Sequence, residues 1–148
     1  MAAKGTVRIH RSNTASSDDL QRSGRATFSV RRMSPMRMVV AVLGELDAVN
    51  ARALGRYVED HVRYSKQLIV DLRAVDFVGS QAFTALYYIS VHCARGDVDW
   101  IILGGPPVRR LLAVCDPQGE LPLAEDLLSG LARLDRLAQC HYHVAPTG

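Results

Sequence analysis

Three features of the sequence predict a single α/β domain in which a mixed, mainly parallel sheet packs with about four helices. Strand patterns and helix patterns alternate along the chain from residue 26 onward. Three largely apolar segments, residues 38–43, 68–72 and 100–103, have the composition of strands buried on both faces. The 148 residues contain no internal repeat and no low-complexity linker, which favours one domain of ordinary size.

The first two strands are expected to form an antiparallel pair. Phe28 and Val30 alternate with polar residues, which is typical of a half-exposed strand that begins near Ala26. The Ser34-Pro35 dipeptide predicts a turn, so the apolar run 38–43 follows closely and should pair with this strand.

Gly44 is expected to end the second strand, and a helix over about residues 48–64 should follow it. Asp47 and Asn50 precede or begin this helix and are predicted to cap it with their side chains. Its apolar stripe comprises Ala51, Leu54, Val58 and Val62.

The strand at residues 68–72 should lead into a helix over about 80–94, which Gly96 ends. A third buried strand, 100–103, then precedes a Gly-Gly-Pro-Pro turn and a further helix. The segment 116–119 is expected to break that helix, residues 121–123 to form a short edge strand, and residues 125–138 to form the last helix. The inward faces of these three helices are predicted to carry Ala82, Ala85, Leu86, Ile89 and Cys93; Val108, Leu111, Leu112 and Cys115; and Leu127, Leu128, Leu131 and Leu134.

The charge of the chain is concentrated at its N-terminus. The sequence holds 18 Lys and Arg against 15 Asp and Glu, a net charge of +3, and residues 1–25 alone hold five basic and two acidic residues. The remaining 13 basic and 13 acidic residues cancel, which argues against a nucleic-acid partner. We predict a disordered basic tail over residues 1–25, a domain over 26–140 and a C-terminal tail over 141–148.

The sequence shows no export signal and no apolar run near the length of a membrane span, so we expect a cytoplasmic protein with no membrane partner. Three widely spaced cysteines form no CxxC pair and indicate neither a disulfide framework nor a zinc site. No cofactor is expected.

None of the possible catalytic motifs in the sequence is favoured over a structural role. The Gly-Gly-Pro-Pro turn at 104–107 lacks a phosphate-loop pattern, and Ser80 lacks the GxSxG context of a nucleophile. Asp71 and Asp76 could form a carboxylate pair, and His141 with His143 could bind a metal, but neither pair has clear companions. The sequence therefore predicts a protein that is not an enzyme.

The loop that contains Gly79 and Ser80 follows a buried strand and opens a helix, where α/β sheets usually build binding surfaces. Gly79 is expected to allow the sharp turn, and Ser80 to act as N-cap of the helix. A phosphate on Ser80 would lie at the positive end of that helix. A purely structural cap is the alternative.

The order of elements and motifs resembles the STAS domains of anti-sigma factor antagonists, over about residues 26–138. Gly44-Glu45-Leu46-Asp47 resembles the turn that precedes the first helix of that family. Val75-Asp76-Phe77-Val78 leads into the serine loop as in family members, and Val108-Arg109-Arg110-Leu111-Leu112 is similar to the helix that follows a later strand.

The resemblance implies a protein-binding switch that sequesters an anti-sigma factor and so releases a sigma factor. It also implies that the anti-sigma factor is an ATP-dependent serine kinase that phosphorylates Ser80 and so breaks the complex. The family loop usually reads Asp-Ser-Ser-Gly or Asp-Ser-Thr-Gly, and here Gly79, Gln81 and Ala82 replace three of its four residues.

The predicted partner-binding surface combines the loop after Leu43, the Ser80 loop and the exposed face of the helix that follows Ser80. Alternatives that the sequence leaves open are a sensor of a nucleotide or other small ligand and a scaffold subunit of a stress-signalling assembly. Tyr87 and Tyr88 could extend the surface, although Tyr87 could equally pack against the sheet. The residues predicted to bind the partner are Gly44, Asp47, Asn50, Gly79, Ser80, Gln81 and Thr84.

Overall fold

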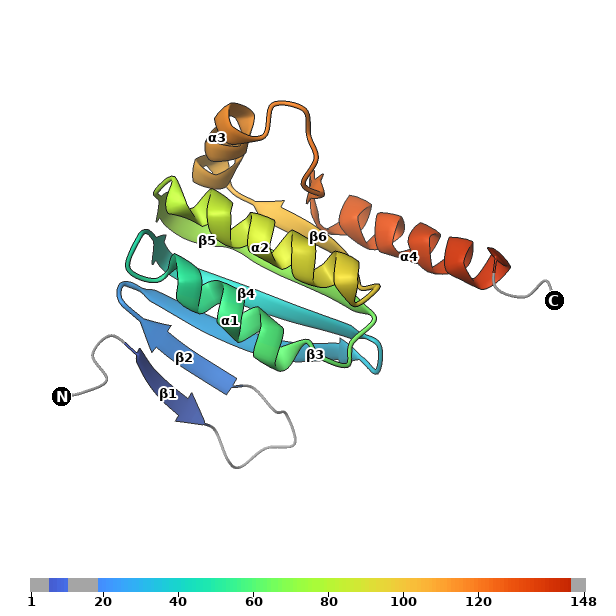
Figure 1. The fold of residues 1–148 in the computed structure, drawn as a ribbon, viewed down its shortest axis with the longest axis horizontal. Coiled ribbons are helices and arrows are strands. Elements are labelled where there is room, and N and C mark those ends of the chain that lie inside the picture. Colours follow the sequence, from blue (N-terminus) through green and yellow to red (C-terminus); the bar gives the residue numbers. More distant parts are fainter. Residues whose placement is uncertain (1–5, 11–18, 145–148) are drawn as a thin grey trace.

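The fold is built on one mixed sheet whose strands follow one another in chain order. The computed structural model describes residues 6–10 and 19–144, and its seven strands are arranged β1-β2-β3-β4-β5-β6-β7 (Figure 1). The first four strands are antiparallel, and β4 to β7 are parallel. The strands are β1 (Thr6–His10), β2 (Asp19–Ser23), β3 (Ala26–Ser34), β4 (Arg37–Leu46), β5 (Gln67–Val78), β6 (Asp99–Gly104) and β7 (Leu123–Ala124).

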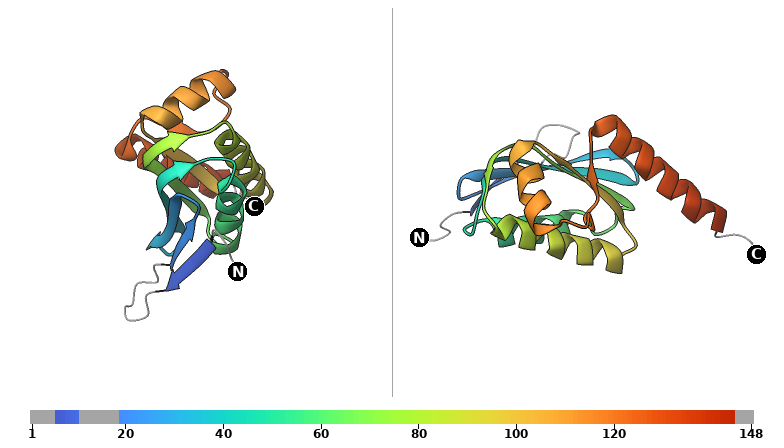
Figure 2. Two further views of the ribbon diagram at one scale, coloured as in Figure 1. Left: turned by 90° about the vertical axis from the view of Figure 1, so that its left-hand side faces the viewer. Right: turned by 90° about the horizontal axis from the view of Figure 1, so that it is seen from above.

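Four helices cover the sheet, which confirms the predicted fold class. α1 (Ala51–His61) and α2 (Gln81–Arg95) lie side by side on one face, α3 (Pro106–Cys115) packs near the end of β5, and α4 (Leu127–Val144) crosses the opposite face (Figure 2). Within the described residues, no helix combines the length and apolar character that spanning a bilayer requires.

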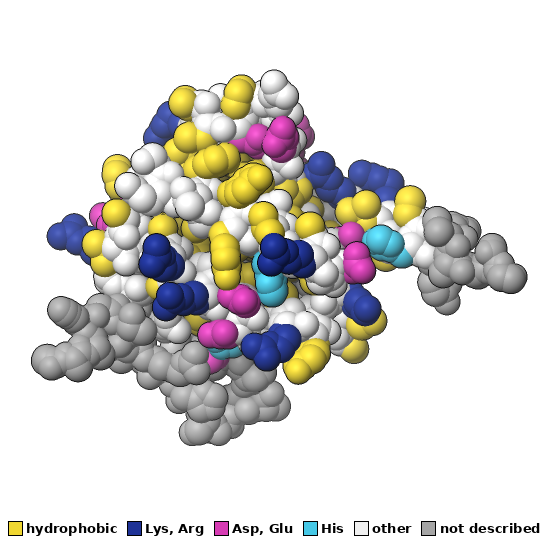
Figure 3. Space-filling model, in the orientation of Figure 1, with side chains coloured by type: hydrophobic (Ala, Val, Ile, Leu, Met, Phe, Trp, Pro, Cys, Tyr) yellow, Lys and Arg dark blue, Asp and Glu magenta, His cyan; other side chains and the backbone are white. Residues whose placement is uncertain are grey.

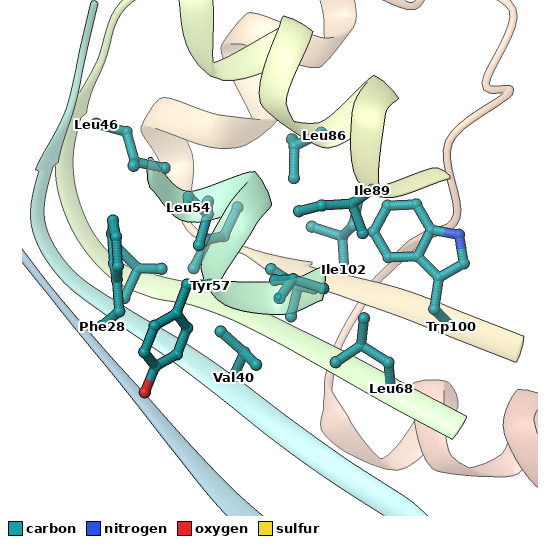
Figure 4. Close-up of a cluster of buried hydrophobic side chains, with 14 of the residues drawn as sticks. Phe28, Val40, Leu46, Leu54, Tyr57, Leu68, Leu86, Ile89, Trp100 and Ile102 are labelled. Carbon is teal, nitrogen blue, oxygen red and sulfur yellow. The ribbon is translucent and has the colours of Figure 1, made fainter. Parts of the chain in front are cut away.

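Apolar side chains fill both faces of the central strands. The larger cluster lies between the sheet and α1, α2 and α3, and the smaller one lies beneath α4. Each fully buried large apolar side chain contributes about 1.5–3 kcal/mol of burial free energy, so these clusters are the main source of stability. The predicted inward stripes of the first two helices are buried as expected. Figure 4 shows the centre of the larger cluster, with Phe28, Val40, Leu46, Leu54, Tyr57, Leu68, Leu86, Ile89, Trp100 and Ile102.

Two strands are longer than their apolar runs predicted. β4 continues past Gly44 to Leu46, so the expectation that Gly44 ends this strand is wrong. β5 continues to Val78, and its end pairs with the end of β4 after two register shifts. Polar and exposed residues in these extensions, such as Arg73 and Asp76, interrupt the hydrophobic pattern from which the strand limits were inferred.

Gly44 permits the extension of β4 because its backbone has φ +99°. A Cβ at this position would lie 2.1 Å from the carbonyl oxygen of Arg25. Neither the conformation nor the space therefore accommodates a side chain.

The Gly44→Ala variant is expected to lose substantial stability in urea unfolding. Gly119→Ala is the matched control, because Gly119 also has a positive φ but no atom within 4 Å of the added Cβ. The control should cost about 1–2 kcal/mol from backbone strain alone. Gly44→Ala should cost clearly more, and equal losses in the two variants would contradict the clash with Arg25.

The prediction of a disordered tail over residues 1–25 is wrong for the described part, because residues 6–10 and 19–23 form strands β1 and β2. Asp19 anchors β2 to α1: its Oδ2 lies 2.8 Å from Nε2 of His61, and its carbonyl accepts the Tyr57 hydroxyl. The polar sequence around Asp19 does not indicate these contacts, because their partners lie about 40 residues away in α1. Residues 1–5 and 11–18 lie outside the described residues.

The last helix also exceeds its predicted limit. α4 runs to Val144, past the C-terminal tail expected from residue 141. A hydrogen-bonded cluster holds it to the sheet, since Gln67 Nε2 donates to the Leu134 carbonyl and Arg37 pairs with Asp135 at 2.9 Å. Leu128, predicted to face inward, is instead 78% exposed.

Candidate functional site

The serine loop lies at the carboxyl end of β5, beside the end of β4. The Gly79 N–H donates to the Leu46 carbonyl at 2.8 Å and so joins the two strand ends. Ser80 follows at the start of α2 and is exposed. The loop and the turn after β4 therefore form one surface, as predicted from the parallel strands.

The Ser80 hydroxyl does not cap α2, contrary to prediction. Ser80 already has helical backbone angles, φ −62° and ψ −24°, and its side chain makes no capping hydrogen bond. A capping hydroxyl needs an extended backbone at its own residue to reach the N–H groups of the first turn. Backbone carbonyls of Gly79 and Ser80 accept the N–H groups of Ala82 and Phe83 instead. The hydroxyl is therefore left exposed to solvent.

Asn50 is a buried link between three segments and not the side-chain cap that was predicted for α1. Its Oδ1 accepts the Asp47 N–H at 3.0 Å, and its Nδ2 donates to the carbonyls of Ser23 and Glu45 at 3.1 and 2.9 Å. It is 0% exposed. Asn50 thus sets the shape of the turn from inside and has no surface to present to a partner.

Asp47 likewise does not cap the helix with its side chain. Its Oδ1 accepts the Val49 N–H at 3.0 Å within the turn, while its carbonyl accepts the N–H groups of Asn50 and Ala51. This local bond orients the carboxylate beside the Ser80 loop.

Gly79 is not required by its backbone angles, because positive φ among the described glycines occurs only at Gly24, Gly44 and Gly119. A side chain here would be tight only against the end of the flexible Gln81 side chain. A Cβ on Gly79 would lie 3.2 Å from Oε1 of Gln81 and 3.9 Å from Cβ of Asp47. The expected sharp turn therefore needs no special conformation here. The absence of a side chain lets the Asp47 turn and the Gln81 side chain come close to the loop.

A groove of about 520 Å³ runs between α1 and α2 and joins the Ser80 loop through Gln81 and Thr84. Figure 3 shows this face of the molecule, where hydrophobic side chains lie among basic and acidic ones over the two helices. The ring of Tyr88 lies against Gly55, and its hydroxyl donates to Glu59 Oε1 at 2.6 Å, which raises the pKa of Tyr88. The groove is lined by Ala48, Ala51, Arg52, Gly55 and Arg56 from the α1 side and by Gln81, Thr84, Ala85 and Tyr88 from α2.

Large apolar side chains are exposed around the same loops. Tyr87 is 54% exposed, so the alternative that it packs against the sheet is wrong, and its ring centroid lies 6.3 Å from that of Phe83. Phe77 and Val49 are 52% and 72% exposed. Phe77, Val49 and the groove arginines are not among the residues predicted from the sequence to bind the partner. The two arginines could have been predicted to be exposed, because they lie on the side of α1 opposite its apolar stripe.

Asp71, one of the two carboxylates considered in the sequence, forms an ion pair with Arg73. Asp71 accepts two hydrogen bonds from the Arg73 guanidinium, at 3.0 and 2.9 Å, on the sheet. Burial acts to raise the pKa of Asp71, but the hydrogen bonds and charge of Arg73 outweigh it and hold the pKa below its ordinary value. Asp71 is thus held ionised in an ion pair.

The Asp71→Asn variant should show a pH-dependent loss of stability. Because the folded pKa is lowered, the stabilisation is present above the unfolded pKa of about 3.9 and is lost as pH falls through the folded value. Urea unfolding at neutral pH should show a loss below about 1 kcal/mol, since half of the Arg73 side chain is exposed. The difference should shrink in acid, and a constant difference would contradict this account.

The histidine pair considered as a metal site is not completed by described residues. His141 lies 3.2 Å from the Asp99 carboxylate, and the side chain of His143 lies outside the described set. Among the side chains that the structure describes, no group of three His, Cys, Asp or Glu is placed to hold a metal ion.

The STAS domain model matches residues 28–127, which is more than half of the chain. The chain belongs to the STAS domain family. The match begins within β3, so strands β1 and β2 precede the part that the family model covers. No curated protein matches the chain in sequence.

Three solved structures are similar to this fold. An anti-sigma factor antagonist from Mycobacterium paratuberculosis is 26% identical, with a TM-score of 0.63, over 74% of this chain and 94% of its own. Unphosphorylated SpoIIAA, an anti-sigma factor antagonist, is 15% identical (TM-score 0.59; 76% and 96% covered). A serine-to-glutamate variant of RsbS from Moorella thermoacetica is 21% identical (TM-score 0.59; 72% and 93% covered). The predicted resemblance to anti-sigma factor antagonists is confirmed.

Proposed function

We propose that this STAS protein is an anti-sigma factor antagonist that sequesters an anti-sigma factor and so releases a sigma factor. One observation carries the proposal: the exposed Ser80, whose hydroxyl makes no capping hydrogen bond, lies where the loops after β4 and β5 meet. The chain that carries this serine is similar over most of its length to a mycobacterial antagonist. The proposed role is binding and not catalysis by this chain. It requires the cytoplasm, where transcription takes place.

The proposed contact surface consists of the exposed part of the two loops and the start of α2. Asp47, Ser80, Gln81 and Thr84 present side chains there, and the exposed ring of Phe77 adds apolar area. Gly44, Asn50 and Gly79 contribute by shaping the loops, because none of them has an exposed side chain to offer. Polar contacts around exposed aromatic rings are typical of transient protein interfaces.

Phosphorylation of Ser80 by the anti-sigma factor, acting as an ATP-dependent serine kinase, is the proposed release step. The γ-phosphoryl group of ATP would pass to Ser80 Oγ, the hydroxyl proton would go to a base of the kinase, and ADP would leave. The phosphate would lie at the positive end of α2, so the fold tolerates it. It would add about two negative charges beside the Asp47 carboxylate and so change the surface that the partner binds.

The three departures from the family loop are compatible with this role for physical reasons. Ala82 is 1% exposed and packs into the core, so it does not take contact area from a partner. Gln81 is exposed, and Gly79 leaves space that Asp47 and Gln81 approach. The carboxylate that the family carries at the position of Gly79 is absent here, and the loop keeps the Asp47 carboxylate of the neighbouring turn beside it.

The proposal is tested with the anti-sigma factors of the source genome, each purified and titrated calorimetrically against the chain. We expect one of them to bind, and to transfer labelled phosphate from ATP to the wild-type chain but not to Ser80→Ala. If none binds, the antagonist role is wrong. If one binds without phosphate transfer, antagonism stands and the phosphorylation step is wrong.

A further inference from the structure

Two arginines line the groove between α1 and α2 beside the proposed contact surface. Arg52 and Arg56 lie one helical turn apart on α1 and line the groove, and both are exposed. Neither forms an ion pair with any residue that the structure describes. No described residue that lines the groove is acidic. The guanidinium groups are therefore free to bind an external carboxylate.

The floor of the groove consists of small side chains. Ala51 and Gly55 from α1 and Ala85 from α2 leave the space between the helices open. Tyr88 closes one part of it, since its ring lies against Gly55 and its hydroxyl is bonded to Glu59. The Glu59 carboxylate keeps its negative charge in that bond, but the two arginines that line the groove outnumber it. A narrow apolar floor with cations along one side is complementary to an amphipathic segment.

We propose that this groove receives an acidic amphipathic segment of the anti-sigma factor, with Arg52 and Arg56 binding its carboxylates. This inference rests on the proposed function and identifies the chemistry of the partner. The segment would present apolar side chains to Ala51, Ala85 and the ring of Tyr88 and would continue past Thr84 toward Ser80. Arginine is suited to this role because its planar guanidinium can bind a carboxylate through two parallel hydrogen bonds.

The charge of the chain itself argues against an internal occupant. Residues 1–5 contain one lysine and no acidic residue, residues 11–18 contain one arginine and one aspartate, and residues 145–148 contain no charged side chain. None of these segments carries the net negative charge that the groove would select. A second copy of this chain remains a competing occupant, which the test distinguishes.

The test compares an Arg52→Glu/Arg56→Glu variant with an Arg110→Glu/Arg136→Glu control of equal net charge. Arg110 and Arg136 are exposed on α3 and α4, away from the groove. Glutamate is a good helix former, and position 52 lies in the first turn of α1, where a negative charge is favourable. Unchanged melting curves should confirm that both variants fold. The probe is the anti-sigma factor that binds the wild-type chain in the titration above.

We expect the groove variant to bind that factor at least about tenfold more weakly, and the control to change affinity less than about threefold. Raising the salt concentration should weaken wild-type binding more than binding by the groove variant. Equal affinities of the wild type and the groove variant would overturn this inference and leave the proposed function standing. If no anti-sigma factor binds the wild type, both are overturned. A wild-type dimer in sedimentation that the groove substitutions dissociate would assign the groove to a second copy and also overturn the inference.

Discussion

The Ser80→Glu variant should bind the anti-sigma factor about 100-fold more weakly than the wild-type chain. Ser80 is exposed where the two loops meet, so a carboxylate there places a charge within the proposed interface. A misplaced charge in an interface costs several kcal/mol, and about 2.7 kcal/mol corresponds to the expected 100-fold change. Isothermal titration calorimetry with the purified anti-sigma factor measures the affinity directly.

Two control variants separate the effect of the charge at Ser80 from loss of the hydroxyl and from a change in net charge. Ser80→Ala should bind within about threefold of wild type, because the hydroxyl makes no capping bond whose loss would alter α2. Gln118→Glu adds the same charge in the exposed loop after α3 and should leave the affinity unchanged. Wild-type affinity in Ser80→Glu would show that the serine loop lies outside the interface.

The Asn50→Asp variant should lose about 3 kcal/mol of unfolding free energy, although it changes only one side-chain group. The amide donates to the carbonyls of Ser23 and Glu45 from a fully buried position. A carboxylate cannot donate, and its oxygen would face two carbonyl oxygens without solvent. Each unsatisfied buried polar group costs about 1–3 kcal/mol, more when it is charged.

This substitution separates two roles that the sequence could not distinguish. Asp and Asn are about equally good N-caps, so a simple cap would tolerate Asn50→Asp. A buried link between β2, the end of β4 and α1 would not. Urea unfolding of Asn50→Asp and Asn50→Ala should therefore show both variants to be strongly destabilised, and near wild-type stability of Asn50→Asp would restore the cap interpretation.

The sequence predicted those parts of the fold that hydrophobic periodicity encodes. The largely apolar segments at residues 38–43, 68–72 and 100–103 lie in the three central strands, and the apolar stripe of each crossover helix faces the sheet. The extensions of β4 and β5 were missed because they are held by pairing with one another and not by apolar character. Strands β1 and β2 were missed because pairing with β3 and contacts of Asp19 with α1 create them.

The candidate site was predictable as a location but not as a set of contacts. Parallel strands place the turn after β4 and the loop after β5 at one edge, which a strand–helix pattern already indicates. The role of Asn50 depends on its hydrogen bonds to distant backbone carbonyls, and that of Ser80 depends on its own helical backbone angles. Neither can be inferred from the local sequence. The groove arginines were overlooked because an exposed basic residue on a helix is ordinary until a neighbouring helix places a groove beside it.

The most direct test of the central claim is reconstituted transcription. RNA polymerase, the sigma factor and the anti-sigma factor that binds this chain are combined, and transcript is measured as the chain is added. We predict that wild-type chain and Ser80→Ala restore transcription, whereas Ser80→Glu does not. Failure of the wild-type chain to restore transcription, even in excess over the anti-sigma factor, would contradict the claim that it is an anti-sigma factor antagonist.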